Sequence, residues 1–272
     1  MNKKNSKFKK KITYIVCNFV KNDSRVLKIA SSAQKSGYDI LIIGFQNQED
    51  KILEENYLGI KLILYPNRYL TQIIEQIMFK GKLSDIINKT KIWQNLKGQD
   101  IIYSHDILGL IIIAHCQRRL AYDNIYIPWI HDCHEYMHGS YLYAKKTLGL
   151  KGIGDKDKKR IHYLEQITEY EKSFLNEPDE LITVSPKCAE KIKKSYNIDR
   201  IFNIIFNCPS RSLIKNYKTV RDSLDLKSNE KIIVWCGSVN QSRGTHVIVE
   251  SLKYLHNFHL VIISNQKNEY VE

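Results

Sequence analysis

The chain has no run of apolar residues long enough to cross a membrane. A membrane-spanning helix needs about 20 apolar residues in a row, and the best run here, 108–114, is typical of a buried helix face. The stretch 12–20 after the lysine-rich start is short, is broken by Thr13 and Asn18, and lacks a small-residue cleavage site, which argues against a secretory signal. We therefore expect a cytoplasmic protein.

Closely spaced cysteines are also absent. The 6 cysteines form no CxxC pair and no short metal-ligand spacing, so the sequence indicates neither a disulfide framework nor a zinc site. Most of them adjoin apolar, strand-like runs, which predicts small buried side chains in a reducing compartment.

Glycine and proline are scarce. Only 12 Gly and 5 Pro occur in 272 residues, beside 43% hydrophobic residues, which excludes a low-complexity tail protein and favours a soluble globular one. At about 100–200 residues per domain, the length suits one large domain or two smaller ones.

Acidic residues are outnumbered by basic ones. The 42 Lys and Arg residues against 29 Asp and Glu give a net charge of +13, which favours acidic partners such as nucleic acid, anionic lipid or a phosphorylated substrate. No recognised nucleic-acid motif accompanies this charge, so we expect no nucleic-acid partner. Lysines crowd the tail 1–11, as in a solvated segment or, alternatively, a weak contact with an anionic membrane surface: Lys3, Lys4, Lys7, Lys9, Lys10 and Lys11.

Short β-branched runs alternate with longer helical patterns along the chain. This alternation predicts an α/β fold, a Rossmann-like parallel sheet with flanking helices, because parallel strands need crossover helices between them. The predicted strands are near-continuous apolar runs at 12–17, 40–44, 60–65, 101–104, 127–131, 181–184 and 201–206. The predicted helices are 24–36 with Gly37 as its C-cap, one or two helices within 70–96, then 107–120 and 158–175.

A second α/β block follows a polar segment. Two predicted strands, 231–236 and 258–263, flank a predicted helix at 244–255, as in the opening βαβ unit of a second doubly wound domain. We therefore predict a basic tail (1–11), a first Rossmann-like domain (12–209), a linker (210–230) and the start of a second, incomplete Rossmann-like domain (231–272).

Polar residues gather where predicted strands end and helices begin. Asp23 is suited to be an N-cap and Arg25 to be a solvated or ion-paired residue of the first turn; alternatively, both lie at the mouth of a substrate cleft. His105 lies at the end of another predicted strand, where α/β enzymes place ligand-binding groups. Its neighbour Asp106 could instead be simply the N-cap of the following helix.

The segment 131–135, His-Asp-Cys-His-Glu, is a dense group of titratable residues at the end of a further strand, which makes it a candidate site. His131, His134 and Glu135 could chelate a metal. Short loop spacing rarely aims three side chains at one ion, and no fourth ligand is evident, so we expect no metal. The remaining alternative is that these histidines have a structural role only and make hydrogen bonds within the loop.

Later segments add two more strand ends. Ser185 before a proline predicts the start of a helix, and Asn207 ends the last strand of the first block. In the second block Gly237 allows close backbone approach, and Arg243 can meet a phosphate where the helix begins at Gly244.

Taken in order, these motifs resemble the retaining glycosyltransferases of family 4, which have the GT-B fold of two facing Rossmann-like domains. The likeness runs from residue 12 to residue 263. The matching segments are 23–26 (D-x-R-V in the family), 104–106 (H-D), 131–135 (D-x-H-E), 183–185 (T-V-S), Asn207 before the interdomain linker, and 237–244 (the phosphate loop G-x-…-[KR]-G).

The resemblance implies transfer of a sugar from a nucleotide diphosphate sugar to a glycan or lipid-linked acceptor, with retention and with no cofactor besides the donor substrate. In the family, basic side chains rather than a metal stabilise the departing diphosphate. A role in cell-surface polysaccharide or glycoconjugate synthesis, at the inner face of the membrane, fits the basic start. The implied residues are His134, Glu135 and His105 for catalysis, Gly237, Ser238, Arg243, Gly244 and Asn207 for donor binding, and Asp23, Arg25 and Asp106 on the acceptor side.

Two departures separate the chain from the family pattern. Ser238 stands where many relatives have a second basic residue, and the family's glutamate pair belongs to a later part of the second domain. Glu269 and Glu272 lack that context. The chain thus resembles a C-terminally truncated member of the family. One hypothesis is an enzyme whose missing part lies on a longer chain or on a partner chain. The other is a catalytically incomplete remnant or subunit that acts as a binding or scaffold module for a partner.

Overall fold

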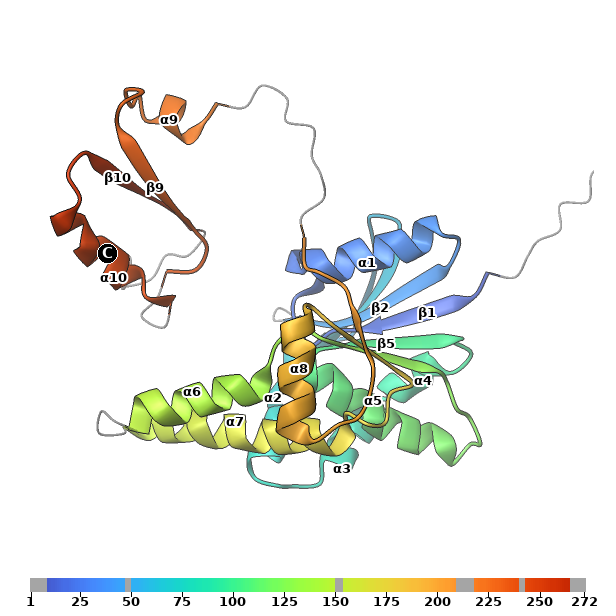
Figure 1. The fold of residues 1–272 in the computed structure, drawn as a ribbon. Coiled ribbons are helices and arrows are strands. Elements are labelled where there is room, and N and C mark those ends of the chain that lie inside the picture. Colours follow the sequence, from blue (N-terminus) through green and yellow to red (C-terminus); the bar gives the residue numbers. More distant parts are fainter. Residues whose placement is uncertain (1–8, 47–49, 150–153, 209–217, 240–242, 265–272) are drawn as a thin grey trace, which may run out of the picture. The chain divides into compact units, whose positions relative to one another are not determined.

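A computed structural model describes residues 9–46, 50–149, 154–208, 218–239 and 243–264 (Figure 1). The chain divides into two compact units, Met1–Cys208 and Pro209–Glu272. The lysines up to residue 8, the linker residues 210–217, and Glu269 and Glu272 lie outside the described part.

The first unit is built on a sheet of 8 strands in the order β3-β4-β2-β1-β5-β6-β7-β8, which confirms the predicted α/β class. All neighbours pair in parallel except β3 and β4. The chain crosses from β1 to β2 on one side and later to β5 on the other, so the switch point of the sheet lies between β1 and β5. The strands are β1 Lys11–Ile15, β2 Asp39–Gln46, β3 Leu53–Tyr57, β4 Ile60–Pro66, β5 Ile101–His105, β6 Trp129–Cys133, β7 Glu180–Thr183 and β8 Phe202–Ile204.

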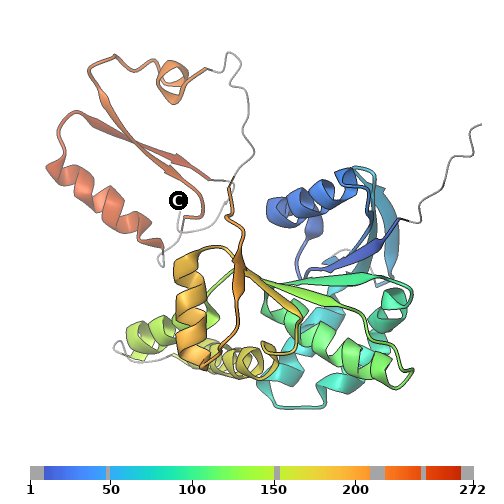
Figure 2. The ribbon, with the colours of Figure 1, turned by 45° about the vertical axis from the view of Figure 1, so that its right-hand side comes forward.

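Helices cover both faces of this sheet, with α1 on one side and α5 on the other (Figure 2). Two apolar clusters follow from this layering: α1 contributes Val26 and Ala30 to one, and α5 contributes Ile111 and Ile112 to the other. The helical elements of the first unit are η1 Val20–Asn22, α1 Ser24–Lys35, α2 Asn67–Met78, α3 Leu83–Thr90, α4 Ile92–Leu96, α5 Asp106–Ala121, α6 Met137–Gly149, α7 Asp155–Phe174 and α8 Pro186–Tyr196. Among the described residues, no helix is long and apolar enough to span a bilayer.

The structure corrects several expectations. The region 70–96 holds three helices rather than one or two, because Lys91 takes a left-handed conformation (φ 57°) between α3 and α4. The edge strand β3 and the helix α6 were not expected from the sequence. Cys208 and Cys236 are exposed, although an apolar neighbourhood predicted buried cysteines.

The second unit consists of α9 Val220–Ser223, β9 Lys231–Cys236, α10 Thr245–Ser251, η3 Leu252–Tyr254 and β10 Phe258–Ile263. The two strands pair in parallel over their full lengths, as the predicted βαβ unit requires. Of the described residues in this unit, only Val239 and Thr245 are buried. The apolar side chains of its strands are therefore partly exposed, with Val234, Ile262 and Ile263 among the most exposed.

Candidate functional site

The carboxyl ends of β1, β5 and β6 meet at one edge of the sheet, beside the switch point. The helix α5 begins there and packs closely on β1. A Cβ atom at Gly109 would lie 3.3 Å from the carbonyl oxygen of Ile15, so the glycine permits this approach. The side chains that follow these strands are thereby brought together.

Asp132, at the end of β6, is the centre of this cluster. Its fully buried carboxylate binds the Arg25 guanidinium, with Nη2 at 2.8 Å from Oδ1 and Nε at 3.1 Å from Oδ2. Arg25 is only 6% exposed, and its Nη1 donates to the carbonyl oxygen of Ile205. Burial alone would raise the pKa of Asp132, but hydrogen bonds from His134 and Arg25 hold it well below its usual range. Arg25 is thus ion-paired and buried rather than solvated, and it also lines a cavity at the start of α1.

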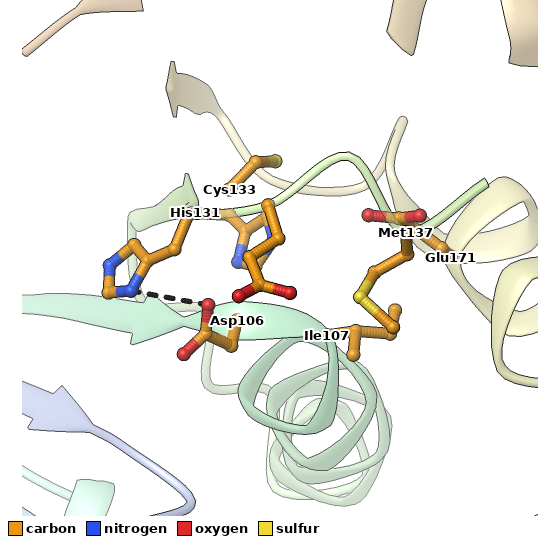
Figure 3. Close-up of a pocket in the computed structure, with 8 residues that line it drawn as sticks. Asp106, Ile107, His131, Cys133, Met137 and Glu171 are labelled. Atoms are coloured by element: carbon orange, nitrogen blue, oxygen red, sulfur yellow. Dashed lines mark ion pairs between the residues drawn. The ribbon is translucent and has the colours of Figure 1, made fainter. Parts of the chain in front are cut away.

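His134 bridges two carboxylates. Its Nδ1 lies 3.2 Å from Asp106 Oδ1, an ion pair marked in Figure 3, and its Nε2 lies 3.3 Å from Asp132 Oδ2. Burial opposes a charged ring, but the hydrogen bonds to Asp106 and Asp132 outweigh it and raise the pKa of His134 to about 9. His134 is therefore an imidazolium at neutral pH.

His105 lies behind His134, away from solvent. Its Nδ1 is 3.0 Å from His134 Nε2, and its ring stacks on Tyr103, with ring centroids 4.7 Å apart. Burial and the neighbouring positive His134 lower the pKa of His105 well below its usual value, so the ring is neutral. The sequence placed His105 at the wall of a cleft, whereas the fully buried ring lines none of the described cavities.

A cavity of about 280 Å³ opens beside His134. Asp106 reaches it from the first position of α5 in a left-handed conformation (φ 56°), while His105 occupies the N-cap position, so the N-cap alternative for Asp106 is wrong. Figure 3 shows Asp106 at the start of α5 and Glu171 on α7 around the same space. The lining residues are Asp106, Ile107, His131, Cys133, His134, Glu135, Met137 and Glu171.

Glu171 is a residue of this cavity that the sequence analysis missed. It is 2% exposed, and Tyr196 Oη donates a hydrogen bond to its Oε2. Burial raises the pKa of Glu171 to about 7, against the opposing effect of the Tyr196 hydrogen bond. The available signal was its spacing, because Glu171 continues the buried face of α7 that contains Leu164 and Ile167.

The metal alternative keeps only His134 of the three residues that the sequence suggested. His131 Nδ1 is engaged with Ser104 Oγ at 2.9 Å, whereas the described ligand atoms that cluster within 4.8 Å belong to His105, Asp132 and His134. His134 is protonated in this arrangement, and Arg25 occupies both carboxylate oxygens of Asp132. These charges already balance one another, so the cluster fits a closed hydrogen-bond network better than a cation site.

A second cavity, also of about 280 Å³, lies at the start of α1. Asp23 caps this helix by accepting from the backbone N–H of Val26 at 3.0 Å, which confirms the N-cap interpretation. Asn207, which the sequence assigned to the donor side, lines this cavity together with Asp23 and Arg25.

In the second unit, the glycines of the segment after β9 take backbone conformations that favour glycine. Gly237 (φ 139°) and Gly244 (φ 72°) both take positive φ angles, which favour glycine, and no heavy atom would crowd a Cβ at either position. Ser238 follows Gly237, and its carbonyl oxygen accepts a hydrogen bond from Trp235 Nε1. The loop residues 240–242 lie outside the described part, so a role of Arg243 in binding phosphate stays a prediction.

The comparisons with known proteins connect this architecture to a fold. No known family model matches the chain, and no curated protein matches it. Sucrose-phosphate synthase from Thermosynechococcus elongatus superimposes with a TM-score of 0.62 at 13% identity, covering 96% of this chain and 64% of that protein. HepE from Anabaena, in complex with UDP-glucose, gives a TM-score of 0.61 at 14% identity, with 96% and 63% covered.

Over the part that superimposes, this chain has the GT-B fold. An α,α-trehalose-phosphate synthase from Burkholderia vietnamiensis is similar at 9% identity, with a TM-score of 0.50 and with 96% of this chain and 65% of that protein covered. At these identities the likeness concerns the fold alone. The chain spans less than two thirds of the length of each of these three proteins.

Proposed function

We propose that the chain is a glycosyltransferase that takes its sugar from a nucleotide diphosphate sugar, in the manner of the retaining enzymes of family 4. The observation that carries this proposal is the charged His134, held between Asp106 and Asp132 beside a cavity at the carboxyl ends of β5 and β6. Open α/β sheets bind ligands outside the carboxyl ends of their strands. The solved proteins of similar fold include one in complex with UDP-glucose.

The proposed reaction exchanges one bond at the anomeric carbon for another. The bond to the diphosphate oxygen breaks, a bond to an acceptor hydroxyl oxygen forms on the same face, and the hydroxyl proton leaves with the diphosphate. Charge builds on the leaving group, where a guanidinium is most effective. In this proposal Arg243, Gly237, Ser238, Gly244 and Asn207 bind the donor, and His134 with Glu135 faces the transferred sugar.

Donor binding is the direct test. The purified chain is titrated with UDP-, GDP- and ADP-sugars by calorimetry, and we expect heat with one of them. Arg243→Ala should weaken that binding by about 1–3 kcal/mol, the scale of a charge-assisted contact. Lys253→Ala, another exposed basic position of the second unit, is the matched control and should bind normally. Absence of binding, transfer and hydrolysis with all three donors would contradict the proposal for this chain.

The second unit supports a further candidate function, a subunit that is completed by additional chain. The apolar strand residues Val234 and Ile263 are 49% and 46% exposed, whereas parallel strands are normally covered on both faces. A partner carrying further αβ units would cover them. Mixing the chain with such a partner should restore donor binding if the isolated chain has none, and size-exclusion chromatography should then show a single complex.

We further propose a glycan or lipid-linked acceptor at the inner face of the membrane, in cell-surface polysaccharide or glycoconjugate synthesis. The net charge of +13 and the lysine-rich start support attraction to anionic lipid. Co-sedimentation with phosphatidylglycerol vesicles should exceed that with phosphatidylcholine vesicles and should fall when residues 1–11 are removed. Equal sedimentation with both lipids would exclude this attraction.

A further inference from the structure

The helices α6 and α7 form a hairpin that extends from the cavity beside His134 to the outer edge of the first unit (Figure 1, Figure 2). Met137, the first residue of α6, and Glu171, near the end of α7, both line the cavity. At a rise of about 1.5 Å per residue, the 13 residues of α6 span about 20 Å. The far end of the hairpin therefore lies about 20 Å from the cavity.

The distal part of the hairpin, residues 141–147 of α6 and 154–163 at the start of α7, contributes almost nothing to the core. Ala144 is the one buried residue among them. In the rest of α7, by contrast, Leu164, Ile167 and Glu171 are buried. The core of the sheet thus does not account for the distal part, whose side chains are available for an interaction.

Basic side chains dominate this distal part. It has six exposed basic residues and only two acidic ones, Asp155 and Asp157. Lys158 lies 3.8 Å from Asp155, and none of the other five basic side chains has an ion pair with a described residue. The uncompensated positive charge favours an anionic partner. The six basic residues are Lys145, Lys146, Lys156, Lys158, Lys159 and Arg160.

Two large apolar side chains are exposed among these charges. Leu142 is 49% exposed and Tyr143 is 59% exposed. Residues three or four positions apart share one side of a helix, so Leu142 lies beside Lys145 and Lys146. A surface that combines lysines with exposed apolar side chains matches the boundary between the headgroups and the acyl chains of a bilayer.

We propose that the distal part of the α6–α7 hairpin is a membrane-contact surface for anionic phospholipids, in which Leu142 and Tyr143 enter the headgroup boundary. The basic side chains meet the lipid phosphates, and a tyrosine ring suits this depth because it is apolar with a polar end. Nucleic acid also offers phosphates, but it has no apolar layer for an exposed leucine. The combination therefore favours a bilayer.

This surface fixes how far the cavity lies from the membrane. With the distal part on the bilayer, α6 spans the distance of about 20 Å between the lipid and the cavity. An acceptor whose lipid anchor stays in the bilayer can then reach the cavity; that such an acceptor is used rests on the proposed function, whereas the contact surface does not. The hairpin also predicts that lipid binding persists in part when residues 1–11 are removed.

The first test is co-sedimentation of the full chain with vesicles of phosphatidylglycerol and phosphatidylcholine in equal parts. Neutralising three basic residues of the distal part should lower the partition coefficient at least about tenfold. A control variant that loses the same charge elsewhere in the first unit should change it less than about twofold. The test variant carries Lys146→Gln, Lys159→Gln and Arg160→Gln, and the control carries Lys35→Gln, Lys51→Gln and Lys61→Gln.

The second test measures contact at one position of the hairpin. Tyr143→Trp adds a fluorophore to the distal part, and brominated phosphatidylcholine in the same vesicles should quench it. Tyr122→Trp, at an 83% exposed position after α5, is the matched control and should not be quenched beyond the wild-type chain. The native tryptophans are present in both variants, so the difference reports the added one.

Several results would overturn the inference: equal sedimentation of the wild-type chain with phosphatidylcholine alone, equal loss in the two triple variants, or no quenching at position 143. Binding of single-stranded RNA or of a second copy of the chain by the hairpin, in place of vesicles, would also overturn it. Donor calorimetry on the same samples separates these outcomes from the proposed function. If the hairpin binds vesicles while no donor binds, the transferase proposal fails and the contact surface stands. Circular dichroism checks that each variant is folded, and the quenching measurement is independent of the triple variants.

Discussion

At the scale of single residues, the site depends on Asp132 more than on its neighbours. Its carboxylate binds Arg25 and His134, and Tyr103 Oη lies 3.3 Å from its Oδ2. The sequence drew attention to the histidines and to Glu135 of this segment, because titratable residues in a row are visible without a structure. That one buried aspartate connects three elements was not visible, since its partners lie on α1, β5 and the loop after β6.

The Arg25–Asp132 pair predicts a large effect of removing one partner. Arg25→Leu leaves the buried Asp132 with His134 as its one remaining cationic partner among the described residues, so we expect a loss of up to about 3–5 kcal/mol in the free energy of unfolding by urea at pH 7. Adding Asp132→Asn to this variant should recover part of the loss. Lys187→Leu, which breaks an exposed ion pair with Glu190, should leave the midpoint unchanged. A similar small effect for Arg25→Leu would show that the pair is not buried.

His134 predicts a pH dependence of stability. Because its pKa is raised from 6.5 to about 9 on folding, the folded state binds this proton more tightly than the unfolded state. The stabilisation is complete below pH 6.5 and is lost as the pH rises through about 9, on the order of 3 kcal/mol. Urea unfolding of wild type and His134→Gln should therefore differ most at pH 6 and least at pH 10. A constant difference across this range would contradict the proposed charge on His134.

At the scale of elements, regular strands and helices could be predicted where one local pattern dominates. The central strands are continuous apolar runs, and Asp23 and Ser185 both cap their helices as predicted. The strand β3 was missed because it is an edge strand whose residues Glu54 and Asn56 are exposed, and it pairs only with β4 among the described strands. The division of residues 70–96 was missed because Lys91 is a non-glycine residue in a left-handed turn, a conformation that its sequence does not favour.

Close packing of η1 against β2 predicts the effect of one added methyl group. A Cβ atom at Gly44 would lie 2.2 Å from Cγ2 of the buried Val20, so Gly44→Ala should cost about 1–3 kcal/mol in urea unfolding. Val20→Ala in the same chain should relieve most of this loss by making room. Gly154→Ala, where no atom lies within 4 Å, is the steric control and should cost less, only the difference in N-cap preference between glycine and alanine at the start of α7. A neutral Gly44→Ala would mean that the two elements are less tightly packed than described.

At the scale of the whole molecule, the two units differ in how much core they have. Both apolar clusters found among the described residues belong to the first unit, and the exposed apolar strand residues noted above belong to the second. The first unit can therefore be stable by itself.

Residues 1–208 should thus fold as an isolated fragment. The tryptophan fluorescence of the fragment, from Trp93 and the buried Trp129, should show cooperative urea unfolding, with the same midpoint as the corresponding transition in the full chain. The dye ANS should bind the full chain more than the fragment, because the fragment lacks the exposed strands of the second unit. A fragment without cooperative unfolding would show that the second unit contributes to the first core.

The sequence by itself determined the alternation of strands and helices, the helix caps and the positions at which polar residues follow strands. These features depend on periodicity and on residues within a few positions of each other. Only the tertiary structure decided that Arg25 pairs with Asp132, 107 positions away, and that Glu171 joins His131 in one cavity. It also decided that His134 is charged while His105 and His131 are neutral. The physical reason is that protonation and pairing depend on burial and on neighbours that long-range packing supplies.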